Sequence, residues 1–204
     1  MDSLETNQIP VDPSPIRLFS KWFQDALDCK QIEDATAMTL ATVDSDNQPW
    51  TRVVLLKEHD DRGFTFFTNS KSIKGEHLEN SPKVSLCFYW PALDHQVRIM
   101  GSAEMISPEE SDAYFQSRPR DSQLGAWASI QSSELDVRRS LMDRIDEVSA
   151  KYEGADVPRP DFWNGYRVTP STIEFWLSRP HRLHERLDYT LNADGTWVQK
   201  GLYP

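Results

Sequence analysis

The order of hydrophobic and polar positions predicts one helix followed by a series of strands. Between Ile16 and Cys29 the apolar residues recur at spacings of three and four, which is typical of an amphipathic helix packed on a core. Beyond this segment the pattern changes to short β-rich runs with polar turns between them. The runs predicted as strands cover 37–43, 50–57, 64–69, 84–90 and 96–106. Short strands at this spacing indicate an antiparallel meander that closes into a barrel or sandwich.

The second half of the chain returns to helices and ends in strands. Ser107 and Glu110 stand in capping-box order around a proline and predict a helix over 108–117. Residues 134–152 carry their apolar side chains on a helical stripe, which predicts another helix. The runs with β character that follow are 172–177, 185–191 and 196–203.

Composition and charge narrow the class of protein. The chain has 204 residues, of which 38% are hydrophobic and 26% charged, and this is typical of a soluble globular protein with one core. We expect an extended arm over residues 1–15 and one domain over 16–204, in which helices pack around a β-barrel. A formal net charge of −10 argues against nucleic acid or a membrane surface as the main partner.

The cysteines and the apolar segments indicate neither a secreted nor a membrane-spanning protein. Cys29 and Cys87 have no metal-ligand spacing with each other or with the five histidines, so we predict no metal site and no disulfide framework. They are expected to be buried, reduced thiols. No segment is apolar and long enough to span a bilayer, and the first residues lack the features of a secretory signal. The expected location is therefore the cytoplasm.

Local clusters of cations are candidates for an anion site in this acidic chain. Arg52 and Lys57 are five apart and would point to opposite faces of a regular strand, unless a bulge or the strand end intervenes. Arg182, His184 and Arg186 alternate, so on a strand they would share one face, where a phosphate could offset their repulsion. A solvated basic edge that prevents strand pairing is the alternative, and spacing leaves both open. Glycine-rich phosphate motifs are absent from the sequence, so side chains would have to hold a phosphate.

Several blocks of sequence, in order along the chain, resemble the pyridoxine 5'-phosphate oxidase family. The blocks are TRVVLLK, FFTN, SRPRDSQLGAWAS with QSS, FW.G.RV, IEFW and RLHER, and the match runs from about residue 12 to the C-terminus. The resemblance implies an FMN-binding split β-barrel with antiparallel, Greek-key-like strands. It also implies a homodimer with two FMN molecules at the subunit interface. The activity it implies belongs to vitamin B6 salvage: pyridoxine 5'-phosphate or pyridoxamine 5'-phosphate is oxidised to pyridoxal 5'-phosphate, and oxygen becomes hydrogen peroxide.

The resemblance also implies roles for individual positions. The residues that would bind FMN are Arg52, Val53, Val54, Leu55, Leu56, Lys57, Phe67, Thr68, Lys74, Gln96, Gln131, Ser132, Trp176 and Arg186. Those that would bind the substrate phosphate are Lys57, Tyr114, Arg118 and Ser122. Arg182 and His184 would lie beside the pyridine ring and act in catalysis. Because a guanidinium stays protonated, we expect Arg182 to orient the ring and screen charge, and His184 or water to take the proton.

Other conspicuous residues are expected to be structural. Arg120 has no matched role, and we predict an ion pair with Asp121 or another acid. The seven tryptophans are expected in the core and at interfaces, and only Trp176 matches a flavin role. The remaining histidines are expected at the surface or in turns: His59, His77, His95 and His181.

Three departures from the family pattern keep other functions open. Ile73 stands where the family usually has a basic residue on the FMN phosphate, and Lys71 is a candidate to replace it. Gly201 replaces a terminal arginine, and the amino-terminal arm lacks the Arg and Tyr that in some members fold over the substrate. One alternative is a related flavin oxidase acting on another ring, as in the phenazine branch, although the retained phosphate residues argue against it. Another is a protein that binds FMN or pyridoxal phosphate without turnover.

Overall fold

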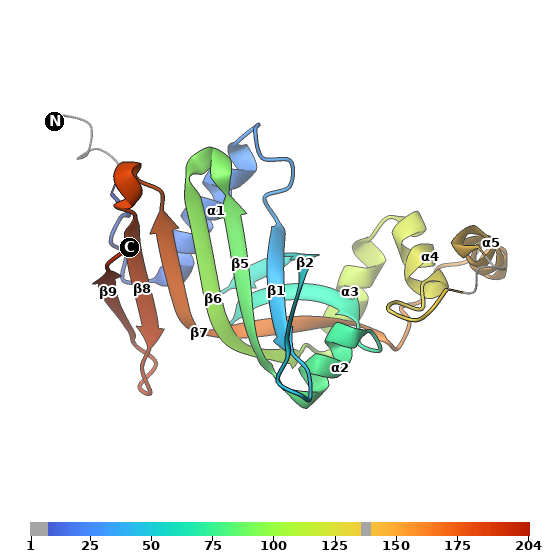
Figure 1. The fold of residues 1–204 in the computed structure, drawn as a ribbon. Helices are drawn as coiled ribbons and strands as arrows, with labels where there is room; N and C mark the ends of the chain where they lie inside the picture. Colours follow the sequence, from blue (N-terminus) through green and yellow to red (C-terminus); the bar gives the residue numbers. More distant parts are fainter. Residues whose placement is uncertain (1–7, 136–139) are drawn as a thin grey trace.

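A curled antiparallel sheet, bent into a half-barrel, forms the body of the protein (Figure 1). The computed structural model describes residues 8–135 and 140–204. Within these residues the sheet has nine strands in the order β2-β1-β5-β6-β7-β4-β3, with β8 paired to β7 and β9 to β8. The strands are β1 (Ala37–Val43), β2 (Pro49–Leu55), β3 (Glu58–Asp60), β4 (Gly63–Asn69), β5 (Lys83–Trp90), β6 (His95–Met105), β7 (Trp163–Leu177), β8 (Glu185–Leu191) and β9 (Trp197–Leu202). The predicted class, a mainly β split barrel with packed helices, is confirmed.

Helix α1 (Pro15–Asp28) covers one side of the half-barrel, as the spacing of its apolar residues predicts. Ser14 caps its first turn. Phe19 is fully buried and meets Phe64 and Phe88 edge to face, with ring centroids 4.8 and 5.1 Å apart. The helix is therefore part of the main core, which it shares with strands β4 and β5.

The other helices gather at one end of the sheet. They are α2 (Ile73–Asn80), α3 (Pro108–Ser117), α4 (Arg120–Ala128) and α5 (Leu141–Lys151). The predicted capping box of α3 is present, since Ser107 accepts from the backbone of Glu110 and the Glu110 side chain accepts from the backbone of Ser107. Within the stripe predicted over 134–152, the described helix begins at Leu141, and residues 136–139 lie outside the described part. Figure 1 shows α3 over the first part of β7, and α4 and α5 beyond the point where this strand begins.

Strand β7 joins two parts of the structure, and it is longer than the predicted run 172–177. One of its edges pairs with β4 over 163–168 and with β8 over 172–177, while the other edge pairs with β6. The two ends of β7 therefore carry different neighbours, and this separation decides where the candidate site residues lie.

The prediction that Arg182, His184 and Arg186 alternate on one strand is wrong. Arg182 ends a single 3₁₀ turn, η2 (Pro180–Arg182), and β8 begins only at Glu185. His181 and Arg182 both have left-handed backbone angles, with φ of 60° and 61°. Pro180 lacks a backbone donor and fixes its own φ, so a regular strand cannot run through this segment.

The amino-terminal segment from residue 8 onward lies against the sheet. The backbone N–H of Ile9 donates to Glu185 Oε1 at 2.9 Å, and the Tyr189 hydroxyl donates to the carbonyl of Asp12 at 2.8 Å. Residues 1–7 of the predicted arm lie outside the described part, and the division into arm and domain stays a prediction. None of the helices described is long and apolar enough to cross a bilayer.

Two expectations about individual residue types are corrected in part. Cys29 and Cys87 are free thiols, but both are half-buried rather than fully buried. His181 lies exposed in a turn as expected, whereas His77 is buried, with 6% of its surface exposed.

Candidate functional site

A cavity of about 520 Å³ lies between β2, β4 and the helices α2, α3 and α4. Its volume is in the range of small-molecule and cofactor sites. Its lining residues are Val53, Val54, Leu55, Lys57, Phe67, Thr68, Asn69, Lys74, Tyr114, Arg118, Ser122, Gly125, Ala126, Ser129, Gln131 and Trp163. The cavity thus brings together most of the residues matched to FMN and all four matched to the substrate phosphate.

Some lining residues had no predicted role. They are Asn69, Gly125, Ala126, Ser129 and Trp163. Asn69 and Trp163 stand inside the family blocks FFTN and FW.G.RV, so the signal for them was present in the sequence. The other three belong to the SRPRDSQLGAWAS block and contribute a small or polar surface.

Lys57 reaches the cavity because strand β2 ends before it. The strand stops at Leu55, and the backbone N–H of Lys57 donates to Thr65 of β4 at 2.9 Å. The predicted requirement for a strand end between Arg52 and Lys57 is therefore met. Leu56 is 3% exposed and packs in the main core, so its side chain is directed away from solvent.

A stack of aromatic rings supports the Arg118 side of the cavity. The ring of Phe67 stacks on Tyr114 at 4.0 Å and on Trp163 at 5.0 Å. The guanidinium of Arg118 lies over the Trp163 ring, and its buried Nη1 has no hydrogen-bond partner among the described residues. Burial lowers the pKa of Arg118. An unpaired buried N–H of this kind is costly, and an anionic ligand would satisfy it.

A second group of polar side chains surrounds Lys74. Its Nζ donates to Gln131 Oε1 at 2.7 Å and to Ser72 Oγ at 3.2 Å, and Thr68 Oγ1 donates to the same Gln131 oxygen at 3.3 Å. Burial, together with the nearby charge of Arg52, lowers the pKa of Lys74 to about 8. A cation destabilised in this way is suited to binding a phosphate.

The two residues of interest beside Lys74 lie outside the cavity lining. Ile73 is the first residue of α2 and is 38% exposed. Lys71 Nζ lies 5.8 Å from the ring centroid of Phe162. That Lys71 takes the role of the basic residue usual in the family, where this chain has Ile73, stays a prediction.

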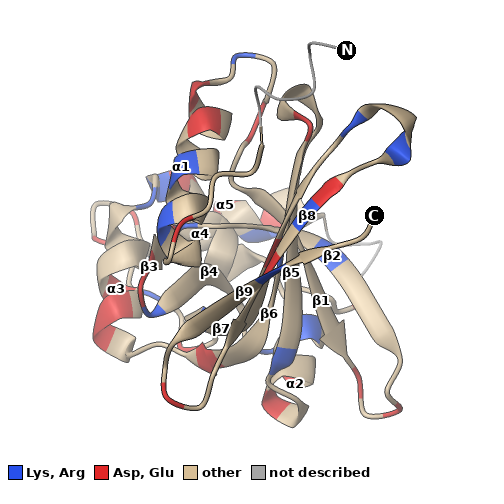
Figure 2. Cartoon of the chain, turned by 90° about the vertical axis from the view of Figure 1, so that its left-hand side faces the viewer, with Lys and Arg blue, Asp and Glu red and all other residues tan. Residues whose placement is uncertain are grey.

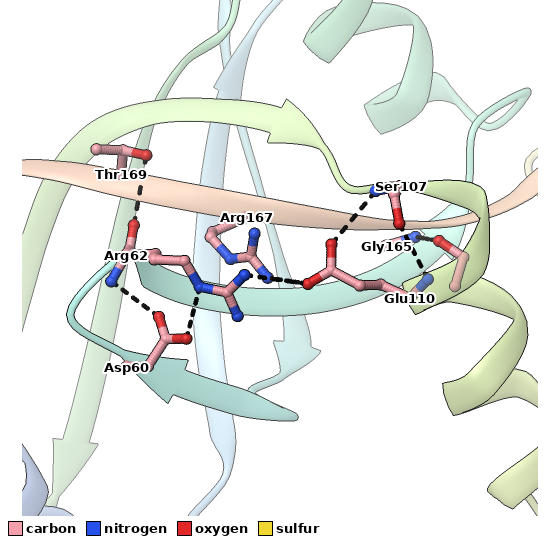
Figure 3. Close-up of polar contacts among 8 residues, drawn as sticks. Asp60, Arg62, Ser107, Glu110, Gly165, Arg167 and Thr169 are labelled. Carbon is pink, nitrogen blue, oxygen red and sulfur yellow. Dashed lines mark hydrogen bonds and ion pairs between the residues drawn. The ribbon is translucent and has the colours of Figure 1, made fainter.

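Helix α3, which carries Tyr114 and precedes Arg118, is held to the sheet by a charged network (Figure 3). Glu110 accepts from Arg167 Nη2 at 2.9 Å and from Arg62 Nη1 at 3.2 Å. Hydrogen bonding by Arg167 lowers the pKa of the Glu110 carboxyl. The next residue of α3 is Ser111, and its hydroxyl oxygen accepts from the backbone N–H of Gly165 at 3.2 Å.

Gly165 permits the close approach at this point. A Cβ there would lie 2.4 Å from Ile106 Cδ1 and 2.7 Å from Phe67 Cε1. The network and this contact together fix α3 on β7, next to the aromatic stack.

Among the residues that the structure describes, Arg120 has no ion pair of the predicted kind. Its Nη1 donates to the carbonyl of Ala155 at 2.9 Å and its Nη2 to the carbonyl of Tyr152 at 2.6 Å. These carbonyls lie at and beyond the end of α5, where backbone acceptors lack intrahelical donors. Arg120 therefore fastens α4 to α5 through backbone oxygens.

Another group of matched residues lies at the other end of β7. Gln96, Trp176 and Arg186 are cross-strand neighbours on β6, β7 and β8, so they share one face of the sheet. The His184 ring lies 4.6 Å from the Trp176 ring. A second cavity, of about 410 Å³, includes His184, Arg186 and Gly201 in its lining. Figure 2 shows basic and acidic positions side by side on this part of the sheet.

Arg186 is already engaged by its own chain. Its Nε and Nη2 donate to the two carboxylate oxygens of Glu174 at 2.9 and 3.0 Å, and its Nη1 donates to the carbonyl of Tyr203 at 2.9 Å. Burial raises the pKa of Glu174, but hydrogen bonds from Arg186 and Arg98 outweigh it and leave the pKa lowered. Arg186 is therefore part of a paired charge cluster with Glu174 and Arg98, whereas Arg182 is exposed.

One chain does not bring the two groups of residues to one cavity. Gly165 is opposite Phe67 at the first cavity, and Trp176 is eleven residues further along β7. His184 and Arg186 line the second cavity and not the first. We call the residues of the first cavity the phosphate half-site, and the group of Gln96, Trp176, Arg182, His184 and Arg186 the ring half-site. Ser132, with a left-handed φ of 71°, follows Gln131 but does not line the first cavity.

Comparison with known proteins identifies relatives over nearly the whole chain. The family model described as pyridoxamine 5'-phosphate oxidase matches residues 27–152, and that described as the pyridoxine 5'-phosphate oxidase C-terminal dimerisation region matches residues 163–204. The pyridoxine/pyridoxamine 5'-phosphate oxidase of Ralstonia pickettii is 51% identical over 194 residues, which are 95% of this chain and 91% of that protein. The protein of the same name from Mesorhizobium japonicum is 45% identical over 201 residues, 98% of each chain.

Solved structures of other proteins also resemble this chain over nearly its whole length. PhzG from Burkholderia lata 383, in complex with tetrahydrophenazine-1-carboxylic acid, is 33% identical with a TM-score of 0.90, over 100% of this chain and 98% of that one. A pyridoxamine 5'-phosphate oxidase-related, FMN binding protein from Nostoc punctiforme is 17% identical with a TM-score of 0.75, over 95% of this chain and 100% of that one, and supports the fold alone. This chain belongs to the pyridoxamine 5'-phosphate oxidase family.

Proposed function

We propose that this protein is an FMN-dependent oxidase that converts pyridoxine 5'-phosphate or pyridoxamine 5'-phosphate to pyridoxal 5'-phosphate, with oxygen as electron acceptor and hydrogen peroxide as product. The names of relatives at 45–51% identity support this activity. The observation that carries the proposal is the buried, unpaired Nη1 of Arg118 in a cavity also lined by Lys57, Tyr114 and Ser122. These are the residues that would hold the substrate phosphate.

The donor set of the phosphate half-site fits FMN. Lys74, Thr68 and Gln131 offer an ammonium, a hydroxyl and an amide close together, and Arg52 lies near enough to lower the pKa of Lys74. Such a set of donors suits a phosphate dianion. FMN, when bound, supplies the acceptor for the two electrons and the C4' hydrogen that leave the substrate. The chain's own task is to bind and orient the two ligands so that the reacting atoms are close.

A second copy of the chain would complete the site. None of the ring half-site residues lines the first cavity, and His184 and Arg186 line a separate one, so we infer that one chain does not close around one ligand with both. The match of residues 163–204 to a dimerisation region supports a homodimer. In this proposal FMN lies at the subunit interface, with the phosphate half-site of one protomer facing the ring half-site of its partner.

The hydrogen bonds of His184 suggest how the proton is handled. The backbone N–H of Arg179 donates to His184 Nδ1 at 3.2 Å, so in the neutral ring the proton is on Nε2. That nitrogen can donate to a substrate but not accept from it. We therefore assign the orientation of the ring substrate to Arg182 and to His184 Nε2–H, and proton removal to water.

The visible spectrum of the purified protein tests the proposal. We expect a bound-flavin spectrum that bleaches when pyridoxine 5'-phosphate is added without oxygen, and hydrogen peroxide when air is admitted. A flavin spectrum that the substrate leaves unchanged would reject turnover of this substrate. It would favour a protein that binds flavin without this reaction, or an oxidase of another ring compound, which the likeness to PhzG makes the second candidate. A protein that takes up no FMN would reject the proposal.

We also propose a cytoplasmic location. Both cysteines are free in the structure, and free thiols are typical of reducing compartments.

A further inference from the structure

A chain of three buried or half-buried polar side chains links helix α2 to strands β1 and β2, behind the Lys74 side of the first cavity. His77 of α2 is 6% exposed and Thr42 of β1 is fully buried. His77 Nδ1 lies 2.9 Å from Thr42 Oγ1, and Arg52 Nη1 lies 2.6 Å from the same oxygen. The histidine expected at the surface is thus part of a connected polar network.

The direction of each hydrogen bond follows from the groups involved. A guanidinium has donors and no acceptor, so Thr42 Oγ1 accepts from Arg52. The hydroxyl hydrogen of Thr42 then goes to His77 Nδ1, since the described residues offer it no other acceptor. His77 therefore accepts at Nδ1 and carries its proton on Nε2. The chain runs one way, from Arg52 through Thr42 to His77.

The hydrogen bonds from Arg52 through Thr42 to His77 hold one edge of the Arg52 guanidinium and leave its other edge free. Nη1 is bound to Thr42 Oγ1 and also to the carbonyls of Leu40 at 3.3 Å and Trp50 at 3.4 Å. No hydrogen bond of Nε or Nη2 is found within the described residues. Lys74 precedes His77 by three residues on α2, so both point from the same side of the helix. Arg52 stands directly behind the lining residue Val53 and is close enough to Lys74 for its charge to lower the pKa of that amine, although Arg52 does not itself line the first cavity. Two cations placed in this way would be stabilised by an anion.

We propose that His77 is a positioning residue for the cofactor: through Thr42 it fixes the Arg52 guanidinium so that the Nε and Nη2 edge faces the phosphate of FMN. The inference rests on the proposed function, because it takes FMN as the ligand of this cavity. His77 does not touch the ligand itself. Its contribution is to keep Arg52 in one orientation, so that less conformational freedom is lost when the phosphate binds.

Comparison of FMN with riboflavin separates this role from a merely structural one. Riboflavin has the same ring system but no phosphate, so a change that misplaces Arg52 should affect FMN alone. Dissociation constants for both flavins can be measured on the protein after removal of bound flavin, by the quenching of flavin fluorescence. Two pairs of variants at the chain supply the test. Thr42→Val removes the hydroxyl at constant shape and Thr42→Ser keeps it, while His77→Phe removes the acceptor and His77→Asn places an amide oxygen near the position of Nδ1.

We expect Thr42→Val and His77→Phe to weaken FMN binding by about 10- to 100-fold, the range of one charge-assisted hydrogen bond. Riboflavin binding should change by less than about 2-fold, because no phosphate contact is involved. Thr42→Ser and His77→Asn should keep the FMN affinity. His59→Phe is a matched control, since His59 Nε2 also pairs with a hydroxyl, that of Ser20 at 2.9 Å, but outside the cavity lining.

Two results would overturn the inference. One is an equal loss of affinity for FMN and riboflavin in Thr42→Val and His77→Phe, which would mean that the chain only supports the fold. The other is an unchanged FMN affinity in both variants. Failure of the proposed function is seen separately, because then the unaltered protein would not bind FMN at all. If Thr42→Val does not fold, the comparison of His77→Phe with His77→Asn decides the question by itself. If His77→Phe does not fold, the comparison of Thr42→Val with Thr42→Ser decides it.

Discussion

The guanidinium carbon of Arg118 lies 4.6 Å from the ring centroid of Trp163, while its Nη1 is buried without a hydrogen-bond partner among the described residues. A cation–π contact of this kind contributes about 0.5–2 kcal/mol, but it does not replace the hydrogen bond that the N–H would make in water. Arg118 is therefore held in place for an anion at some cost to the stability of the unliganded protein.

Arg118→Met is expected to affect binding and stability in opposite directions. The KM for pyridoxine 5'-phosphate should rise by about 10- to 100-fold, because a hydrogen bond to a charged group contributes about 1.5–3 kcal/mol. The unliganded variant should unfold at the same or a higher temperature, since an unpaired buried donor is removed. Steady-state kinetics and thermal unfolding without ligand measure the two effects. A lower unfolding temperature combined with an unchanged KM would contradict the assignment.

FMN binding is expected to weaken as the pH rises above about 8. Burial and the charge of Arg52 lower the pKa of Lys74 from 10.5 to about 8 in the unliganded protein, and a bound phosphate would favour the charged amine and raise that pKa again. Binding above pH 8 therefore takes up a proton, and the dissociation constant should increase by up to about 10-fold per pH unit. Fluorescence titrations between pH 7 and 9.5 test this.

The lowered pKa of Lys74 also makes the stability of the unliganded fold depend on pH, and here stability rises with pH whereas FMN binding weakens. Because the pKa of Lys74 in the folded protein is below its ordinary value of 10.5, charged Lys74 destabilises the unliganded fold below pH 8, and this penalty is relieved as the pH rises from about 8 to 10.5. Lys74→Arg, whose guanidinium stays protonated, should flatten the pH dependence of FMN binding. A steep dependence that persists in Lys74→Arg would show that another group is responsible.

Glu110→Ala is expected to loosen helix α3 and so to impair substrate binding. It removes the side-chain half of the capping box and the bonds to Arg62 and Arg167, and we expect a loss of about 1–2 kcal/mol in unfolding free energy. Because α3 carries Tyr114, the KM should rise several-fold, with a smaller effect on kcat. Glu109→Ala is the control, since this exposed neighbour in the first turn lies outside the network in Figure 3. Equal effects of the two changes would reject a specific role for Glu110.

Mixing two impaired variants, assayed at substrate concentrations well below the KM, is expected to restore part of the activity if each site combines two protomers. Arg118→Ala damages the phosphate half-site and Arg182→Ala the ring half-site. After equal amounts are unfolded together and refolded, half of the dimers would be mixed, and each mixed dimer would have one intact site. Activity should therefore recover to about a quarter of the unaltered level, by the statistics of a two-fold symmetric dimer. No recovery, with mixed dimers shown to form, would mean that both half-sites act within one chain.

His184→Gln is expected to keep turnover within about 10-fold, because the amide of glutamine can donate from near the position of Nε2. A general base contributes about 10²- to 10⁴-fold, so a loss of that size would identify His184 as the proton acceptor instead of water. Arg182→Lys should also keep most of the turnover, as it retains a positive charge beside the ring. Single-turnover reduction of bound flavin without oxygen is the measurement, since it isolates the chemical step.

The elements that the sequence predicted well are those whose side chains follow one simple period. β5 lies at Lys83–Trp90 because Val84, Leu86 and Phe88 alternate into the core, and α3 starts where its capping box stands. Helices α2 and α4 were missed because they are short and their apolar residues form no stripe. They carry Lys74 and Ser122 to the cavity, so their sequence is shaped by the site more than by the core.

The first half of β7 was missed because Gly165 and Pro170 indicate turns. In the structure Pro170 lies opposite Gly101, where the register of β6 and β7 shifts, and at such a bulge a missing N–H is tolerated. A Cβ at Gly101 would lie 2.2 Å from the carbonyl oxygen of Thr169, so the two strands meet backbone to backbone there. Pairings of this kind depend on the partner strand and are not visible in local sequence.

The candidate site came from family resemblance, because spacing alone left it undecided. The structure gathers most of those residues in one cavity and places another group at the far end of β7, while Arg52, Leu56 and Ser132 lie in neither place. His77 illustrates what local pattern does not reveal. Its burial depends on a hydrogen-bond partner from a distant strand, Thr42, which itself accepts from Arg52.

The position of the chain's ends has a practical consequence for handling the protein. Gln8 near one end and Gly201 and Leu202 near the other both border the cavity that contains His184. An affinity tag or fluorescent fusion at the carboxyl end would therefore lie beside this cavity, and tagged and untagged protein should differ in turnover. The turn at Asn192–Gly195, at the opposite end of the β8–β9 hairpin, is the safer place for a label or a surface anchor.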